Sequence, residues 1–100
     1  MDKYKVKLYP RARKDIEDIF SYIALEKLSP ENAKRQTDRI WQELKSLDTF
    51  PFSHQERTEG RYAQRGYRQL IIDNYIVIYK IDETTKTIYI VTVQYGGRNI

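Results

Sequence analysis

Two amphipathic helical patterns follow each other in the first half of the chain, with only a few residues between them. In the first pattern, apolar residues recur at spacings of three and four: Ala12, Ile16, Ile19, Phe20 and Ile23. In the second, the same spacing links Ala33, Ile40, Trp41, Leu44 and Leu47. Ser29-Pro30-Glu31 is typical of a helix start, because serine suits the N-cap, proline the first helical position, and a carboxylate the positive end of the helix dipole. The short link predicts that helices 11–26 and 30–47 form an antiparallel hairpin whose apolar residues, Phe20 and Trp41 included, lie in the core.

The other periodic segments have the patterns of β-strands. Residues 4–9 alternate between apolar and polar side chains, and Pro10 ends the strand. Three further β-rich runs follow a loop over residues 48–60, and they cover residues 67–72, 75–81 and 87–95. The links between these runs are short, so the last three strands are predicted to form an antiparallel meander.

The order of these elements predicts an α+β fold in a single domain over residues 1–100. A chain of 100 residues with 40% hydrophobic and 13% aromatic residues has enough apolar surface for one core and too little for two. The strand over residues 4–9 has no neighbour in the sequence to pair with and must join the meander from a distance. We therefore expect a β-α-α-β-β-β order, with the helical hairpin packed on one face of a four-stranded antiparallel sheet.

Composition excludes several classes of chemistry. There is no cysteine, which rules out disulfides and thiolate sites, and the single histidine, His54, stands in no metal-binding motif. No glycine-rich phosphate-binding motif precedes a helix, so we expect no metal and no cofactor. No run of 18 apolar residues and no signal peptide is present, which favours a cytoplasmic protein without a membrane partner.

Positive charge favours an anionic partner and is concentrated before the second strand. The formal net charge is +4, and residues 61–68 hold Arg61, Arg65 and Arg68 with two tyrosines and no acid. These arginines could bind a target, or they could form a solvated loop in which Tyr62 and Tyr67 pack on the core. The pattern does not decide whether Lys80 is exposed.

The element order, together with a set of short motifs, resembles the RelE/ParE toxin superfamily over nearly the whole chain. The motifs are Pro10-x-Ala12-x-x-Asp15-Ile16-x-x-Ile19-x-x-Tyr22-Ile23, Gly66-Tyr67-Arg68, Asn74-Tyr75-x-x-x-Tyr79-Lys80-Ile81 and Ile88-x-Ile90-x-x-Val93. The resemblance implies a toxin of a bacterial type II toxin-antitoxin pair, neutralised by a cognate antitoxin. RelE-like members are ribosome-dependent mRNA endonucleases, whereas ParE-like members inhibit DNA gyrase.

Departures from the RelE pattern favour the ParE-like branch. Ile76 stands where the RelE type has a catalytic arginine, Leu70 where it has a lysine, and the sequence stops at Ile100 before a C-terminal catalytic tyrosine. The long helical hairpin is also characteristic of ParE-like members. Gyrase inhibition is therefore the leading hypothesis, and a toxin fold whose activity has decayed is a third possibility.

The two active hypotheses assign different roles to the candidate residues. For binding to the target, the candidates are Arg61, Arg65, Arg68, Lys80, Tyr95 and Arg98. If the protein instead cleaves mRNA on the ribosome without a metal, Arg68 would stabilise the scissile phosphate, and Tyr95 or His54 would carry the proton. A strand-end tyrosine such as Tyr95 is otherwise a packing residue, and His54 a surface loop residue.

Overall fold

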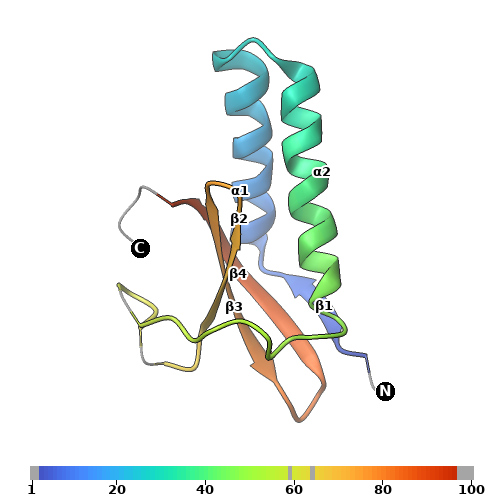
Figure 1. Ribbon diagram of the computed structural model, residues 1–100, viewed down its shortest axis with the longest axis vertical. Helices are drawn as coiled ribbons and strands as arrows, with labels where there is room; N and C mark the ends of the chain where they lie inside the picture. The colour runs from blue at the N-terminus through green and yellow to red at the C-terminus, as the bar shows by residue number, and fades with distance from the viewer. Residues whose placement is uncertain (1–2, 59, 64, 97–100) are drawn as a thin grey trace.

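The computed structural model describes residues 3–58, 60–63 and 65–96, and it has the element order expected from the sequence. The elements are β1 (Lys5–Leu8), α1 (Pro10–Ser21), the π-helical turn η1 (Tyr22–Glu26), α2 (Pro30–Ser46), β2 (Arg68–Ile72), β3 (Tyr75–Asp82) and β4 (Thr87–Tyr95). The helices form an antiparallel hairpin that covers one face of the sheet, and its tip extends beyond the sheet (Figure 1). The α+β prediction is confirmed.

The sheet has the order β1-β4-β3-β2 and is mixed, so the expectation of a fully antiparallel sheet is corrected. β1 pairs with β4 in parallel, whereas β2, β3 and β4 form the predicted antiparallel meander. The helical hairpin accounts for the difference. It returns the chain to the start of β1, where the Tyr4 N–H donates to the Asp48 carbonyl at 2.9 Å. β2 then runs in the same direction as β1, and β4, two reversals later, runs parallel to both.

The segment predicted as helix 11–26 begins at Pro10 and changes from α-helix to a π-helical turn at Tyr22. The hairpin then reverses through Leu28, which has a φ of 53°. Ser29 occupies the N-cap of α2 as predicted, with Pro30 following, but its side chain makes no capping hydrogen bond.

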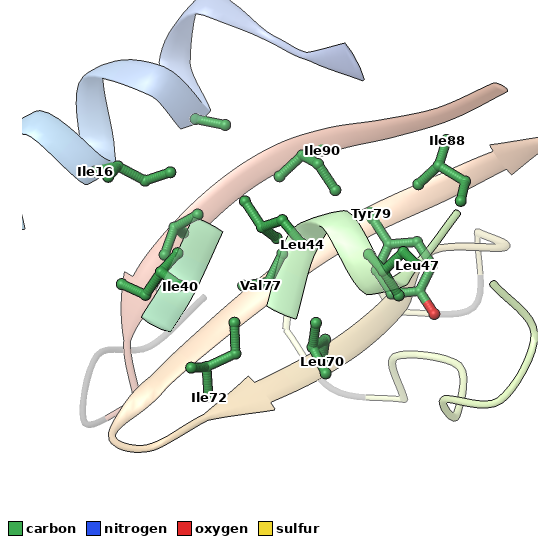
Figure 2. Packing of buried hydrophobic residues seen from close by; sticks show 12 residues of the cluster. Ile16, Ile40, Leu44, Leu47, Leu70, Ile72, Val77, Tyr79, Ile88 and Ile90 are labelled. Carbon is green, nitrogen blue, oxygen red and sulfur yellow. The ribbon is translucent and has the colours of Figure 1, made fainter. Parts of the chain in front are cut away.

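The core lies between the hairpin and the sheet, where side chains of α1 and α2 meet the inward-facing residues of the strands (Figure 2). Its fully buried members include Ile40 and Leu44 of α2 and Val77 and Tyr79 of β3. Phe20 and Trp41, predicted to lie in the core, are 40% and 38% exposed. Both lie at the border of their helical stripes. The small sheet reaches only the central positions, which Ala12, Ile16, Ile40 and Leu44 occupy.

Asp15 of α1 replaces a missing strand along half of β4. β1 ends at Leu8, opposite Ile90, so the following residues of β4 have no strand on that side. The Asp15 carboxylate accepts hydrogen bonds there from the Val93 N–H at 3.0 Å and from the Thr92 hydroxyl. This interaction fixes α1 against the sheet and gives the Val93 N–H a partner at that edge.

Candidate functional site

Lysines and tyrosines form a row across the outer face, by which we mean the sheet face opposite the helices. Lys7 and Lys80 are both paired with Tyr89 in the strand register, and all three side chains point outward. The Lys80 ammonium lies 5.6 Å from the ring centroid of Tyr9 and 5.8 Å from that of Tyr89. A hydrogen bond to the Tyr9 hydroxyl raises the pKa of Lys80, and Tyr67 adds to this electrostatically. Lys80 is thus a partly exposed cation among tyrosines.

The loop before β2 carries two further cations. Arg61 and Arg65 are exposed, and no hydrogen bond or ion pair holds either side chain within the described part of the chain. Tyr62 and Tyr67 contact each other, with ring centroids 5.1 Å apart, and both are partly buried outside the main core. The loop therefore adds exposed positive charge outside the strands.

Arg68 has its closest contacts on the inner side of the sheet, the side of the helices. It is paired with Tyr79 in the strand register, so it points to the face opposite Lys80. Its Nη1 donates to the His54 carbonyl at 2.6 Å, and its guanidinium lies 5.2 Å from the Phe52 ring centroid. Arg68 therefore attaches the loop to β2.

Tyr79 binds the same loop, which precedes β2, from the inner face of the sheet. Its hydroxyl donates to the Pro51 carbonyl at 2.7 Å, and its ring contacts that of His54 at 6.4 Å. Burial raises the pKa of Tyr79 to about 12, although the nearby Arg68 charge acts in the opposite direction. Partly buried His54 is thus part of a packed segment.

Tyr95 lies at the other end of the sheet, in a groove between α1, η1 and the ends of β3 and β4. Its ring contacts that of Tyr75 at 5.9 Å, and burial, followed by the proximity of Tyr95, raises the pKa of Tyr75. The groove has a volume of about 700 Å³ and is also lined by Tyr22, which is 53% exposed. Its other lining residues include Asp15, Asp18, Ile19, Ile23 and Lys27.

A second, smaller cavity of about 390 Å³ lies between β1 and α2. Its walls are mainly apolar and are formed by Tyr4, Val6, Leu8, Trp41 and Leu44, with Lys45 and Asp48 at its border. The N–H groups of Lys5 and Tyr9 donate toward β4, so by alternation those of Val6 and Leu8 point to the open edge of the sheet. An apolar cavity thus lies beside an unpaired strand edge.

The three residues considered for RNA cleavage do not form one cluster. Arg68 and His54 are neighbours, but Tyr95 lies two strands away across the sheet and four residues, or about 13 Å, further along the strand direction. Lys80 lies on the outer face and Arg61 and Arg65 are exposed in the loop before β2, whereas Arg98 falls outside the described residues. In the described part of the chain, no three His, Cys, Asp or Glu residues gather as metal ligands, and no helix is long and apolar enough to cross a membrane.

Sequence reasoning did not find Lys7, Tyr9 and Tyr89 as partners of Lys80. The sequence shows that these residues alternate with apolar ones on two strands. It does not show that β1 and β4 pair in parallel, which is what places the residues next to one another. The groove at Tyr95 also went unpredicted, because Tyr22 and Tyr75 come together only through packing.

Solved structures share this fold at low sequence identity. The chromosomal ParDE toxin-antitoxin system of P. aeruginosa is 20% identical with a TM-score of 0.75, over 93% of this chain and 96% of that one. The RelBE2 complex of Mycobacterium tuberculosis is 18% identical with a TM-score of 0.69, over 93% and 98%. The intact E. coli RelBE complex is 12% identical with a TM-score of 0.64, over 95% and 99%.

No curated protein sequence gives a significant match. A protein-family model, however, described as the ParE toxin of the type II toxin-antitoxin system parDE, matches residues 6–100. The match spans nearly all of the fold described above, from β1 through β4. The chain therefore belongs to the ParE toxin family of type II toxin-antitoxin systems.

Proposed function

We propose that this toxin arrests growth by binding and inhibiting DNA gyrase, without cleaving RNA. The observation that carries the proposal is the separation of Arg68 and His54 from Tyr95. Metal-free RNA cleavage needs a base, an acid and a phosphate-binding cation within hydrogen-bond reach of one phosphodiester. Here Arg68 and Tyr95 are at different ends of the sheet, and one Arg68 nitrogen is already bound to the loop.

The groove at Tyr95 is the surface that we assign to gyrase. Aromatic side chains at the centre of a concave surface commonly contribute most to protein-protein affinity. Tyr22 and Tyr95 are both 53% exposed at this groove, and Tyr75 lies beside them. Arg98 remains a predicted contact of the same surface, since it follows β4 by three residues in the sequence.

Purified toxin is expected to block the supercoiling of relaxed plasmid by gyrase. The double substitution Tyr22→Ala/Tyr95→Ala is expected to raise the inhibitory concentration of the toxin at least about tenfold. The reason is the loss of two exposed rings from one groove. Phe50→Ala is the matched control, because Phe50 is 62% exposed and does not line the groove.

The same preparations should be incubated with ribosomes and mRNA. Ribosome-dependent cleavage by the wild type, with supercoiling unaffected, would overturn the proposal in favour of a nuclease. Equal inhibition by the double variant and the wild type would instead reject the groove as the gyrase contact.

We also propose that a cognate antitoxin, encoded by the adjacent gene, binds at β1. The open edge of β1 can accept an added strand, and the cavity beside it can accept an apolar side chain. Lys3, Lys5 and Lys7 are exposed along this strand, which favours an acidic segment.

Trp41→Ala is expected to weaken antitoxin binding at least about tenfold in calorimetric titration with the product of the adjacent gene. Trp41 forms a wall of the cavity and is 38% exposed, and circular dichroism checks that the variant is folded. Leu25→Ala, at a 71% exposed position in η1, is the control. Normal affinity of the Trp41 variant would place the antitoxin elsewhere.

A further inference from the structure

The outer face of the sheet carries a net positive charge. Among the described strand residues, its outward-facing positions hold Lys5, Lys7 and Lys80 against one acid, Asp82. The Asp82 carboxylate already accepts the N–H groups of Thr84 and Thr85 in the β3–β4 turn. The three ion pairs of the described chain all lie elsewhere, and each includes a helix residue.

The spacing of these cations suits an extended anion. Lys5 and Lys7 are two residues apart on one strand, about 7 Å along it. Lys7 and Lys80 stand in one row on either side of Tyr89, two strand spacings or about 10 Å apart. Arg61 and Arg65 add two exposed cations in the loop that precedes β2.

The aromatic rings on this face are partly buried and already contact protein groups. Lys80 lies against both Tyr9 and Tyr89, whose centroids are 5.8 Å apart, and Tyr67 is in edge contact with Tyr62. Recognition of single strands relies on free aromatic faces on which bases stack. The groups left for a ligand are ammonium, guanidinium and hydroxyl donors, which contact phosphates without reading sequence.

We propose that the outer face binds the phosphate backbone of duplex DNA, so that the toxin engages gyrase together with its DNA. The choice of DNA as the polyanion rests on the proposed function, whereas the preference for phosphates over bases rests on the partial burial of the rings and their contacts with protein groups. Binding is independent of sequence and sensitive to salt. The face is distinct from the groove at Tyr95, so one toxin molecule can contact gyrase and DNA together.

The test is fluorescence anisotropy of a labelled 20-base-pair duplex titrated with the purified toxin over a series of salt concentrations. Lys7→Ala/Lys80→Ala is expected to weaken binding at least about tenfold at low salt. Each lost phosphate contact removes about 0.9 from the slope of log affinity against log salt, so the slope should fall by roughly 1.8. Circular dichroism checks that the variant is folded.

Lys14→Ala/Lys34→Ala is the matched control. It removes the same charge from α1 and α2, at side chains 68% and 74% exposed, and should retain affinity within about twofold. Absence of duplex binding by the wild type, or equal loss in both double variants, would overturn the proposal. Tighter binding of a single-stranded DNA or RNA 20-mer than of the duplex would overturn the assignment to duplex DNA.

This measurement contains no gyrase, so the two proposals can fail separately. Duplex binding without inhibition of supercoiling would refute the gyrase proposal alone. Inhibition of supercoiling that is unchanged by Lys7→Ala/Lys80→Ala, in a variant that no longer binds the duplex, would refute joint engagement of gyrase and DNA.

Discussion

Alanine in place of Asp15 should lower the free energy of unfolding by about 2 to 4 kcal/mol. The carboxylate accepts hydrogen bonds from the Val93 N–H and the Thr92 hydroxyl, and Thr92 is fully buried. Its removal leaves two donors without a partner in the packed contact between α1 and β4, and each such donor costs about 1 to 3 kcal/mol. Chemical denaturation followed by circular dichroism measures the loss.

Two further variants separate this effect from a general loss of charge. Asp18→Ala removes an acid from the same helix, but Asp18 is exposed and pairs with Lys14 on the surface, so a change below about 1 kcal/mol is expected. Asp15→Asn keeps an oxygen acceptor and should lie between the two alanine variants. A cost for Asp15→Ala no larger than that for Asp18→Ala would show that α1 is held to the sheet by other contacts.

The second large effect is a loss of stability in alkali through Tyr79. Burial raises the pKa of this phenol to about 12 in the folded protein, against about 10 in the unfolded chain. Above pH 10 the unfolded chain releases the proton and the folded protein retains it, so stability falls as the pH rises. The difference of two pKa units corresponds to roughly 2 to 3 kcal/mol lost between pH 10 and pH 12.

Tyr79→Phe tests this assignment by comparison with the wild type across the same pH range. At neutral pH the variant lacks the bond to the Pro51 carbonyl and should be about 1 kcal/mol less stable. Above pH 10 the gap should close, and the variant should become the more stable protein near pH 12. Other tyrosines and lysines titrate in both proteins and cancel in the difference. Parallel curves for the two proteins would contradict the role of Tyr79.

Periodicity was sufficient to predict the elements because each has one clear pattern in the sequence. The hairpin followed from two stripes and a short link, and the meander from three β-rich runs with short turns. The direction of β1 was wrong, since it depends on where a hairpin and a long loop return the chain. Strand patterns contain no signal for that path.

The sequence predicted which residue types belong to the candidate site better than it predicted how those residues are arranged. Lys80 lies on the outer face of the sheet, but Arg68 points to the other side. One residue of register decides which face a side chain occupies. The exposure of Phe20 and Trp41 has a related cause. Helical spacing shows which side of a helix is apolar, but it does not show how much of that side the sheet covers.

The use of a helix side chain in place of a longer edge strand limits where this chain can change in length. Extra residues at the end of β1 would place a strand along β4 where Asp15 now lies, and α1 would be displaced. Extra helical turns at the tip of the hairpin would displace no strand or side chain of the sheet, because the tip extends past the sheet (Figure 1). Insertions and deletions in relatives should therefore be found near Leu28 and avoid the single-residue junction, Tyr9, between β1 and α1.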